Sequence, residues 1–226
     1  MKRRLKPLFL FFLLMGLSVL VSMPAYANDY NLKNIKGKTI YAPLASKKFK
    51  QYTLIRWDSS LGELDYGSMK YSKKGLSIEA DPEYNFIEIT PKKTGTYKFS
   101  LKLNDAGKMK KYTFKVKVFK LTKLPFTSIK FGSTKVRLTG LHYSFVESIS
   151  SKKLLSTGTD TGKFKIKLRK GWSVKSAVME HNGKTKKVSL KKKITYKNFL
   201  DRLTITFKDN KKNELMFELC GVPDNG

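Results

Sequence analysis

The sequence predicts an all-β protein made of two consecutive antiparallel β-sandwiches that follow a signal peptide. Apolar and aromatic residues alternate with lysines at every second position, and short alternating runs recur between clusters of Gly, Asn, Asp and Pro. Period-two alternation is typical of strands with one buried and one solvated face. Several short strands separated by regular turn signals are typical of a sandwich. No apolar repeat at helical spacing persists over three turns, so we expect helix only as a short connector.

Residues 1–27 have the order of a secretory signal peptide. The segment Met1–Lys6 carries four positive charges, an uncharged apolar run follows from Leu8 to Val21, and Ala25-Tyr26-Ala27 is a small-x-small triplet. We expect cleavage after Ala27, which makes the mature chain extracellular, either secreted or held non-covalently at a cell surface, with no membrane span. The alternative is a retained anchor, although the run is shorter than the about 20 apolar residues that a span needs.

Alternation and turns divide the rest of the chain. We expect an N-terminal linker at 28–37, a first sandwich at 38–121, a second at 126–220 and a tail at 221–226. The clearest hairpin runs from Thr94 to Val118, where aromatic and aliphatic residues alternate with lysines on both sides of a turn at 104–107. Asn182-Gly183 predicts a second tight hairpin, because this dipeptide tolerates the positive φ angles of a two-residue turn.

The Thr94–Val118 hairpin resembles the last two strands of bacterial immunoglobulin-like domains, in which a Gly-Thr-Tyr segment opens a strand and a lysine-rich strand closes the domain. The second block resembles lysine- and glycine-rich modules of secreted and surface proteins of Gram-positive bacteria, through Ser128–Gly132, Lys170–Val174 and Asn182-Gly183-Lys184. The resemblance implies two immunoglobulin-like sandwiches with a spacer, adhesion or carbohydrate-contacting role. It carries no catalytic or binding residue to this chain.

The charge of the chain is strongly positive. The net charge is +30 over 226 residues, and four of these charges belong to the signal segment. Such a field attracts anionic polymers through salt-sensitive contacts. The densest cationic stretch is Lys184, Lys186, Lys187, Lys191, Lys192 and Lys193, which we predict to bind an anion or glycan. The alternative is a solvated strand face, since lysines also keep sheet edges from pairing.

The sequence offers little for catalysis or metal binding. His142 and His181 stand apart without metal-ligand spacing, and the one cysteine, Cys220, lacks a nearby base and is expected to be a small buried side chain. Asp58, Glu63 and Asp65 form the densest acidic group, and we interpret them as solvated loop residues. We expect no catalytic residue, no metal and no cofactor.

These patterns predict a non-enzymatic exported protein for binding, adhesion or spacing that associates electrostatically with anionic cell-wall polymer or glycan, or with another surface protein. Nucleic acid is not the expected partner. The alternative is an exported hydrolase whose carboxylate pair the sequence does not reveal. The sequence leaves the ligand and the oligomeric state open.

Overall fold

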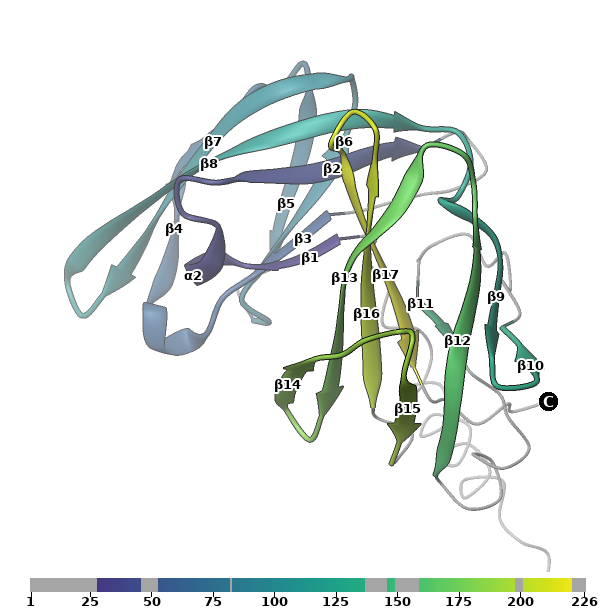
Figure 1. Cartoon of the computed structure of the whole chain (residues 1–226). Coiled ribbons are helices and arrows are strands. Elements are labelled where there is room, and N and C mark those ends of the chain that lie inside the picture. Colours follow the sequence, from purple (N-terminus) through teal and green to yellow (C-terminus); the bar gives the residue numbers. More distant parts are fainter. Residues whose placement is uncertain are drawn as a thin grey trace, which may run out of the picture.

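The computed structural model describes residues 28–45, 53–81, 83–136, 146–148, 159–197 and 201–220, which form two β-sandwiches (Figure 1). The predicted fold class is thereby confirmed for this part of the chain. The signal segment 1–27 and the tail 221–226 lie outside the described residues, so cleavage after Ala27 stays a prediction. Within the described ranges, no helix has the length and apolar character to cross a bilayer.

The first sandwich packs two four-stranded sheets around one core. One sheet has the order β1 (Asn28–Asn31), β3 (Thr53–Arg56), β6 (Phe86–Pro91), β5 (Leu76–Asp81). The other has the order β2 (Thr39–Ala45), β8 (Lys108–Leu121), β7 (Gly95–Asp105), β4 (Glu63–Lys70). Two short helices, α2 (Leu32–Ile35) and η1 (Ser59–Leu61), join strands. Trp57, Phe99 and Phe114 are among the buried core residues, with the last two rings stacked 4.8 Å apart.

The predicted hairpin at 94–118 is the antiparallel pair β7 and β8. Phe99 pairs with Phe114 and Tyr97 with Val116, so the apolar side chains of both strands share the inner face. The turn uses Ala106 and Gly107, which both have positive φ angles. Period-two alternation therefore gave the strands and their inward faces correctly.

The segment 28–37 is part of the first sandwich rather than a linker. Asn28–Asn31 is strand β1, paired in parallel with β3, and helix α2 follows with Leu32 and Ile35 buried in the core. The Asn31 side chain caps α2 by accepting the N–H of Lys33. A segment this short shows too few alternating apolar residues to predict a strand.

The second sandwich also has two sheets. One has the order β10 (Thr134–Lys135), β9 (Phe126–Phe131), β12 (Asp160–Leu168), β15 (Lys193–Tyr196). The other has the order β11 (Val146–Ser148), β17 (Glu214–Cys220), β16 (Arg202–Asp209), β13 (Trp172–His181), β14 (Lys184–Lys187). Between the sheets the Phe126 ring lies 4.8 Å from Phe217 and 5.4 Å from Phe207, measured between centroids.

Among the described strands, three pairs are parallel, which departs from the purely antiparallel prediction. These pairs are β1 with β3, β2 with β8, and β11 with β17. In the last two, an early strand of a sandwich runs alongside its final strand in the same direction. Alternation predicts which face of a strand is buried but not the direction of its neighbour, so the sequence could not reveal this.

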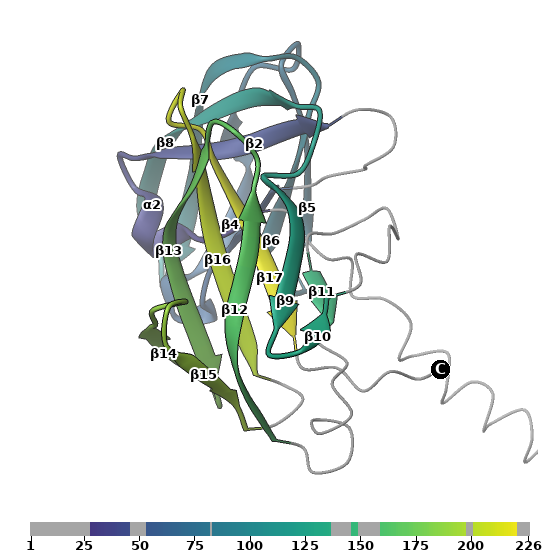
Figure 2. The same cartoon turned by 45° about the vertical axis from the view of Figure 1, so that its right-hand side comes forward.

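The two sandwiches meet at a joint with a short connection. Only residues 122–125 separate β8 from β9, and the guanidinium of Arg169 donates to the carbonyl of Leu124 at 3.1 Å. Phe119 and Leu121, at the end of β8, are buried in the second core, and Tyr41 of β2 packs against it. Strands β2 and β8 of the first sandwich run across the direction of β12, β13 and β16 of the second in both views (Figures 1 and 2). Shared apolar side chains thus connect the two sandwiches.

Candidate anion-binding groove

A groove of about 670 Å³ lies at one edge of the second sandwich, where its two sheets end in different strands. Strand β14 ends one sheet and β15 ends the other, and the segment 188–192 crosses between them. Figures 1 and 2 show these two short strands near each other at the end of the sandwich that points away from the joint. The gap between two sheet edges is therefore open to solvent on this side.

The Asn182-Gly183 turn joins β13 to β14, and residues of both strands line the groove. Both residues have positive φ angles, 48° and 72°, as a tight two-residue hairpin requires, and the prediction of this turn is confirmed. The hairpin pairs His181 with Lys184 and Val178 with Lys187. Strand β14 has four residues, Val188 makes one further bond to the carbonyl of Ala177, and the chain then crosses to β15.

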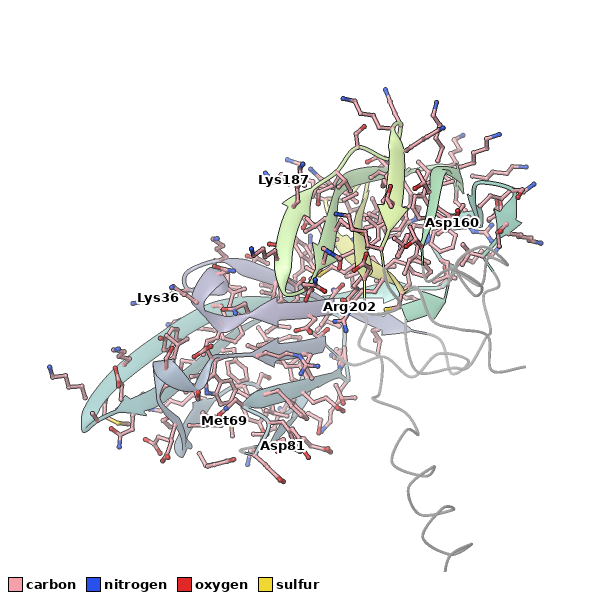
Figure 3. All side chains as sticks on the ribbon, turned by 90° about the horizontal axis from the view of Figure 1, so that it is seen from below. Lys36, Met69, Asp81, Asp160, Lys187 and Arg202 are labelled. Atoms are coloured by element: carbon pink, nitrogen blue, oxygen red, sulfur yellow. The ribbon has the colours of Figure 1, made fainter. Side chains whose placement is uncertain are left out.

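Five of the six predicted lysines line this one groove. They are Lys184, Lys186, Lys187, Lys192 and Lys193, and all five are exposed. Lys191 does not join them, because it lines a separate hollow beside β12 and β13. Lys197, just after β15, is a sixth lining lysine that the sequence reasoning missed, because a gap of three residues separates it from the run. Figure 3 shows Lys187 on the outer part of the second sandwich, away from the joint.

The charge of the groove is not compensated locally. Among the described residues, no carboxylate oxygen lies within 4.0 Å of the Nζ atom of any groove lysine. Met179 and Ile194 are buried beneath the lysines, and Val188 is half-buried beside them. The described lining residues include no Phe, Tyr or Trp. The described groove is thus a cationic rim over a narrow apolar floor, and the imidazole of His181 is the one aromatic ring among its described lining residues.

Asp201 is the carboxylate among the described lining residues, and both of its oxygens already have protein partners. The Asp201 side chain is 1% exposed, and its Oδ2 accepts the backbone N–H of Lys197 at 2.7 Å. Its Oδ1 lies 2.5 Å from Nδ1 of His181, whose side chain is 35% exposed at the groove. The pairing joins residues 20 positions apart, and the sequence gave no signal for it. Among the described lining residues there is thus one acid, which is paired, whereas a glycoside hydrolase site uses two opposed carboxylates.

The acidic residues singled out from the sequence belong to the first sandwich. Asp58 caps η1 by accepting the N–H of Ser60 at 2.8 Å and is exposed, while Glu63 is exposed and Asp65 half-buried on β4. Within the described residues, no three His, Cys, Asp or Glu side chains gather closely enough to hold a metal ion. His142 lies outside the described residues.

A different charged cluster, which the sequence did not indicate, forms at the joint. Asp29 of β1 pairs with Arg56 of β3 at 2.9 Å, and Arg202 of β16 lies 3.5 Å from Glu218 of β17. Burial raises the pKa of both carboxyls, Asp29 and Glu218, despite the neighbouring guanidinium groups. Figure 3 shows Arg202 where the two sandwiches meet. Strand pairing brings these residues together from distant parts of the chain.

Cys220 lies beside this cluster. It is half-buried and pairs across the strands with Arg202, which in turn pairs with Glu180. Burial raises the pKa of the Cys220 thiol, which keeps it protonated and weakly nucleophilic. Because side chains alternate along β13, His181 projects to the face opposite Glu180 and therefore away from Cys220. The cysteine and the described histidine are thus on different faces of the sheet.

Comparison with known proteins gives structural likeness only. No protein-family model matches the sequence, and no curated protein matches it. Among solved structures, the chain is similar to the fibronectin(III)-like modules of CbhA from Clostridium thermocellum, with TM-score 0.25 and 9% identity over 84% of this chain and 92% of that one. It is also similar to the N-terminal four Ig domains of Dscam1 isoform 4.44, with TM-score 0.26 and 9% identity over 84% of this chain and 52% of that one.

A third similar structure is the endo-fucoidan hydrolase MfFcnA4 of glycoside hydrolase family 107. Its TM-score is 0.28 and its identity 8%, over 83% of this chain but only 28% of the hydrolase. At TM-scores of this size, the assignment of the fold rests on the strand order of the chain itself, which is that of two immunoglobulin-like β-sandwiches in succession.

Proposed function

We propose that this is an exported, non-enzymatic binding protein that holds a linear anionic polymer of the cell surface in the groove between β14 and β15. One observation carries the proposal: six exposed lysines line one open groove, and among the described residues no carboxylate oxygen lies within 4.0 Å of their ammonium groups. The order of charged, apolar and small residues in 1–27, which is that of a secretory signal, supports an extracellular location. The first sandwich, joined firmly to the second, then acts as a spacer.

The form of the groove favours a flexible polyanion over other ligands. Six like charges in one groove repel one another, and a polymer with regularly spaced anions relieves this repulsion while releasing its own counterions. The described lining residues include no Phe, Tyr or Trp for stacking a base of single-stranded nucleic acid or a neutral sugar. Phosphodiester polymers and acidic glycans of the cell wall have the required chemistry.

Binding to purified poly(glycerol phosphate), measured over a salt series, tests the proposal. Neutral dextran serves as the uncharged comparison, and a single-stranded oligonucleotide of equal charge serves as the nucleic-acid comparison. The logarithm of the affinity should fall linearly with the logarithm of the salt concentration. Equal affinity for dextran, or affinity that does not weaken with salt, would exclude charge recognition. Stronger binding of the oligonucleotide would exclude a wall polymer as the preferred class.

A matched pair of variants locates the site. The groove variant carries Lys186→Gln, Lys187→Gln and Lys193→Gln, while the control carries three equivalent changes on exposed positions of the first sandwich, Lys98→Gln, Lys111→Gln and Lys115→Gln. Both variants lose the same net charge. We expect roughly a tenfold or larger loss of affinity and a salt slope lower by about two to three for the groove variant only. Equal losses would show that the whole basic surface, rather than the groove, attracts the polymer.

A further inference from the structure

We infer that an extended peptide segment of a partner protein, in which acidic and aliphatic residues alternate, binds as an added strand along a free edge of β12. The site is a second hollow, of about 440 Å³, which residues of β12, β13 and the segment 188–191 line. It is separate from the groove between β14 and β15 and does not depend on the proposed function. Three features carry the inference: a strand edge without a neighbour, an exposed apolar floor and a row of uncompensated lysines.

The part of β12 nearest the joint has a described neighbour on one side only. Residues 160–163 pair with β15, whereas 164–168 pair with β9 on the opposite side. The carbonyl of Lys163 accepts the N–H of Gly132, next to β9, and backbone groups alternate in direction along a strand. Those of Ile166 therefore point to the free side, where no described residue bonds to them. Figure 1 shows β15 beside only the end of β12 that points away from the joint.

The hollow beside this free edge has an apolar floor. Phe164, Ile166 and Leu168 of β12 line it, and their exposure increases from 7% at Phe164 to 37% at Leu168. Val174 of β13 lines the same hollow and is also 37% exposed. Leu168 and Val174 are two of the five large apolar side chains that are exposed among the described residues. Alternate side chains of an added strand would enter the hollow and cover them.

The outer face of the same stretch is cationic. Lys165 and Lys167 are exposed, and among the described residues no carboxylate oxygen lies within 4.0 Å of either ammonium group. Lys165 also lies directly opposite Lys130 of β9, where like charges repel. An acidic residue opposite each lysine on an added strand relieves this repulsion. The complementary segment therefore has acidic residues on its outer face and aliphatic residues on its inner face.

Two other arrangements fit the structure less well. The edge of β13 at this hollow is interrupted by a register shift between Val174 and Ser176, and irregular edges resist strand addition. A second copy that paired edge to edge through Ile166 would place Lys165 opposite Lys167, so like charges would meet. The net charge of +30 also opposes association of two copies.

The probe is a labelled synthetic peptide of about ten residues in which glutamate and valine alternate, so that it spans the free edge with residues to spare. We expect saturable binding by fluorescence anisotropy. A peptide with glycine in place of each valine keeps the charge and should bind at least about tenfold more weakly, because it covers no apolar surface. Equal affinity of the two peptides would overturn the inference, since charge alone would then explain the binding.

Amide hydrogen exchange locates the added strand in the unaltered protein. The N–H of Ile166 should exchange at least about tenfold more slowly when the peptide is bound, because it gains a partner. The N–H of Lys165 points to β9 and should be protected with and without peptide. Exchange at Ile166 that does not change on binding would place the peptide elsewhere and overturn the inference.

Charge reversal on the strand gives a second test. One variant carries Lys165→Glu and Lys167→Glu, and its control carries Lys98→Glu and Lys115→Glu at exposed positions of β7 and β8, the two inner strands of their sheet. Both variants lose the same net charge. Affinity for the glutamate–valine peptide should fall roughly tenfold in the β12 variant only. Equal losses, or no saturable binding by the unaltered protein, would overturn the inference and leave the proposed function in place.

Discussion

The side chain of Asn28 joins the two sandwiches by accepting the backbone N–H of Met216 at 2.7 Å. Its Nδ2 donates to the carbonyl of Tyr41 in β2, and the residue has no exposed surface. One amide therefore satisfies a backbone acceptor of the first sandwich and a backbone donor at the edge of β17. A buried backbone group without a hydrogen-bond partner costs free energy. The two hydrogen bonds of the Asn28 side chain therefore stabilise the joint.

Replacing Asn28 with Ala should lower the free energy of unfolding by about 2 to 3 kcal/mol, because two buried backbone groups lose their partner. Denaturant unfolding measures the change. Asn31→Ala is the matched control in the same segment, since Asn31 is exposed and caps only the four-residue helix α2; its loss should be about 1 kcal/mol or less. Similar losses from both changes would show that Asn28 does not couple the sandwiches.

The stability of the joint should depend on pH through Glu218. Burial raises the pKa of its carboxyl above the ordinary value of 4.5. A carboxyl whose pKa is raised by folding stabilises the folded state below 4.5 and loses that contribution as the pH rises through the raised pKa. Glu218→Gln stays uncharged throughout, so its free energy of unfolding relative to the unaltered protein should increase as the pH rises from about 4 to about 7.

Unfolding curves at several pH values measure this pH-dependent difference in the free energy of unfolding. Glu63→Gln, at an exposed position of β4, is the control. The control should show no comparable trend. A Glu218 variant that instead becomes relatively less stable toward neutral pH would mean that the pairing with Arg202 outweighs the burial of the carboxyl.

Gly62 should tolerate substitution poorly. Its φ angle is 102°, and a Cβ there would lie 2.3 Å from the carbonyl oxygen of Asn104. Gly37 has a φ angle of 73°, but a Cβ there would meet no atom within 4 Å. Gly37→Ala should therefore cost about 1 kcal/mol for the backbone conformation alone, and Gly62→Ala should cost at least about 2 kcal/mol. Thermal unfolding of both variants compares them directly, and equal costs would contradict the close approach of η1 to β7.

The single cysteine should react slowly while the protein is folded. Burial raises the pKa of the Cys220 thiol, and only the thiolate attacks a disulfide reagent. At about pH 8, reaction with Ellman's reagent should be at least about tenfold slower in the folded protein than in denaturant. Equal rates would show that Cys220 is freely accessible. Because the chain has one cysteine, the signal needs no correction for other thiols.

The sequence predicts the strands whose two faces differ most, and the structure shows why others were missed. β7 and β8 alternate over more than ten residues, so their pattern is plain. β4 shows no such pattern, because its side chains are all exposed or half-buried and its pairing with β7 shifts between Asp65 and Lys70. β15 shows none either, because it has only four residues and follows a run of lysines.

The site could be predicted only where it is local in sequence. Lys184, Lys186 and Lys187 stand together on one short strand, and Lys192 and Lys193 follow closely, so a cationic cluster was visible. The contact of His181 with Asp201 depends on a chain path that no pattern in residues 182–200 specifies. The same holds for the pairing of Asp29 with Arg56, 27 positions away, and for the contact between Asn28 and Met216, 188 positions away.

The parallel pairing of β2 with β8 also determines how the first sandwich responds to tension. The pair runs in register from Thr39 beside Lys115 to Ala45 beside Leu121. The chain enters β2 at one end of this pair and leaves β8 at the other, so a pull on the two ends drives the strands along each other in opposite directions. The bonds between them then share the load together instead of opening one after another.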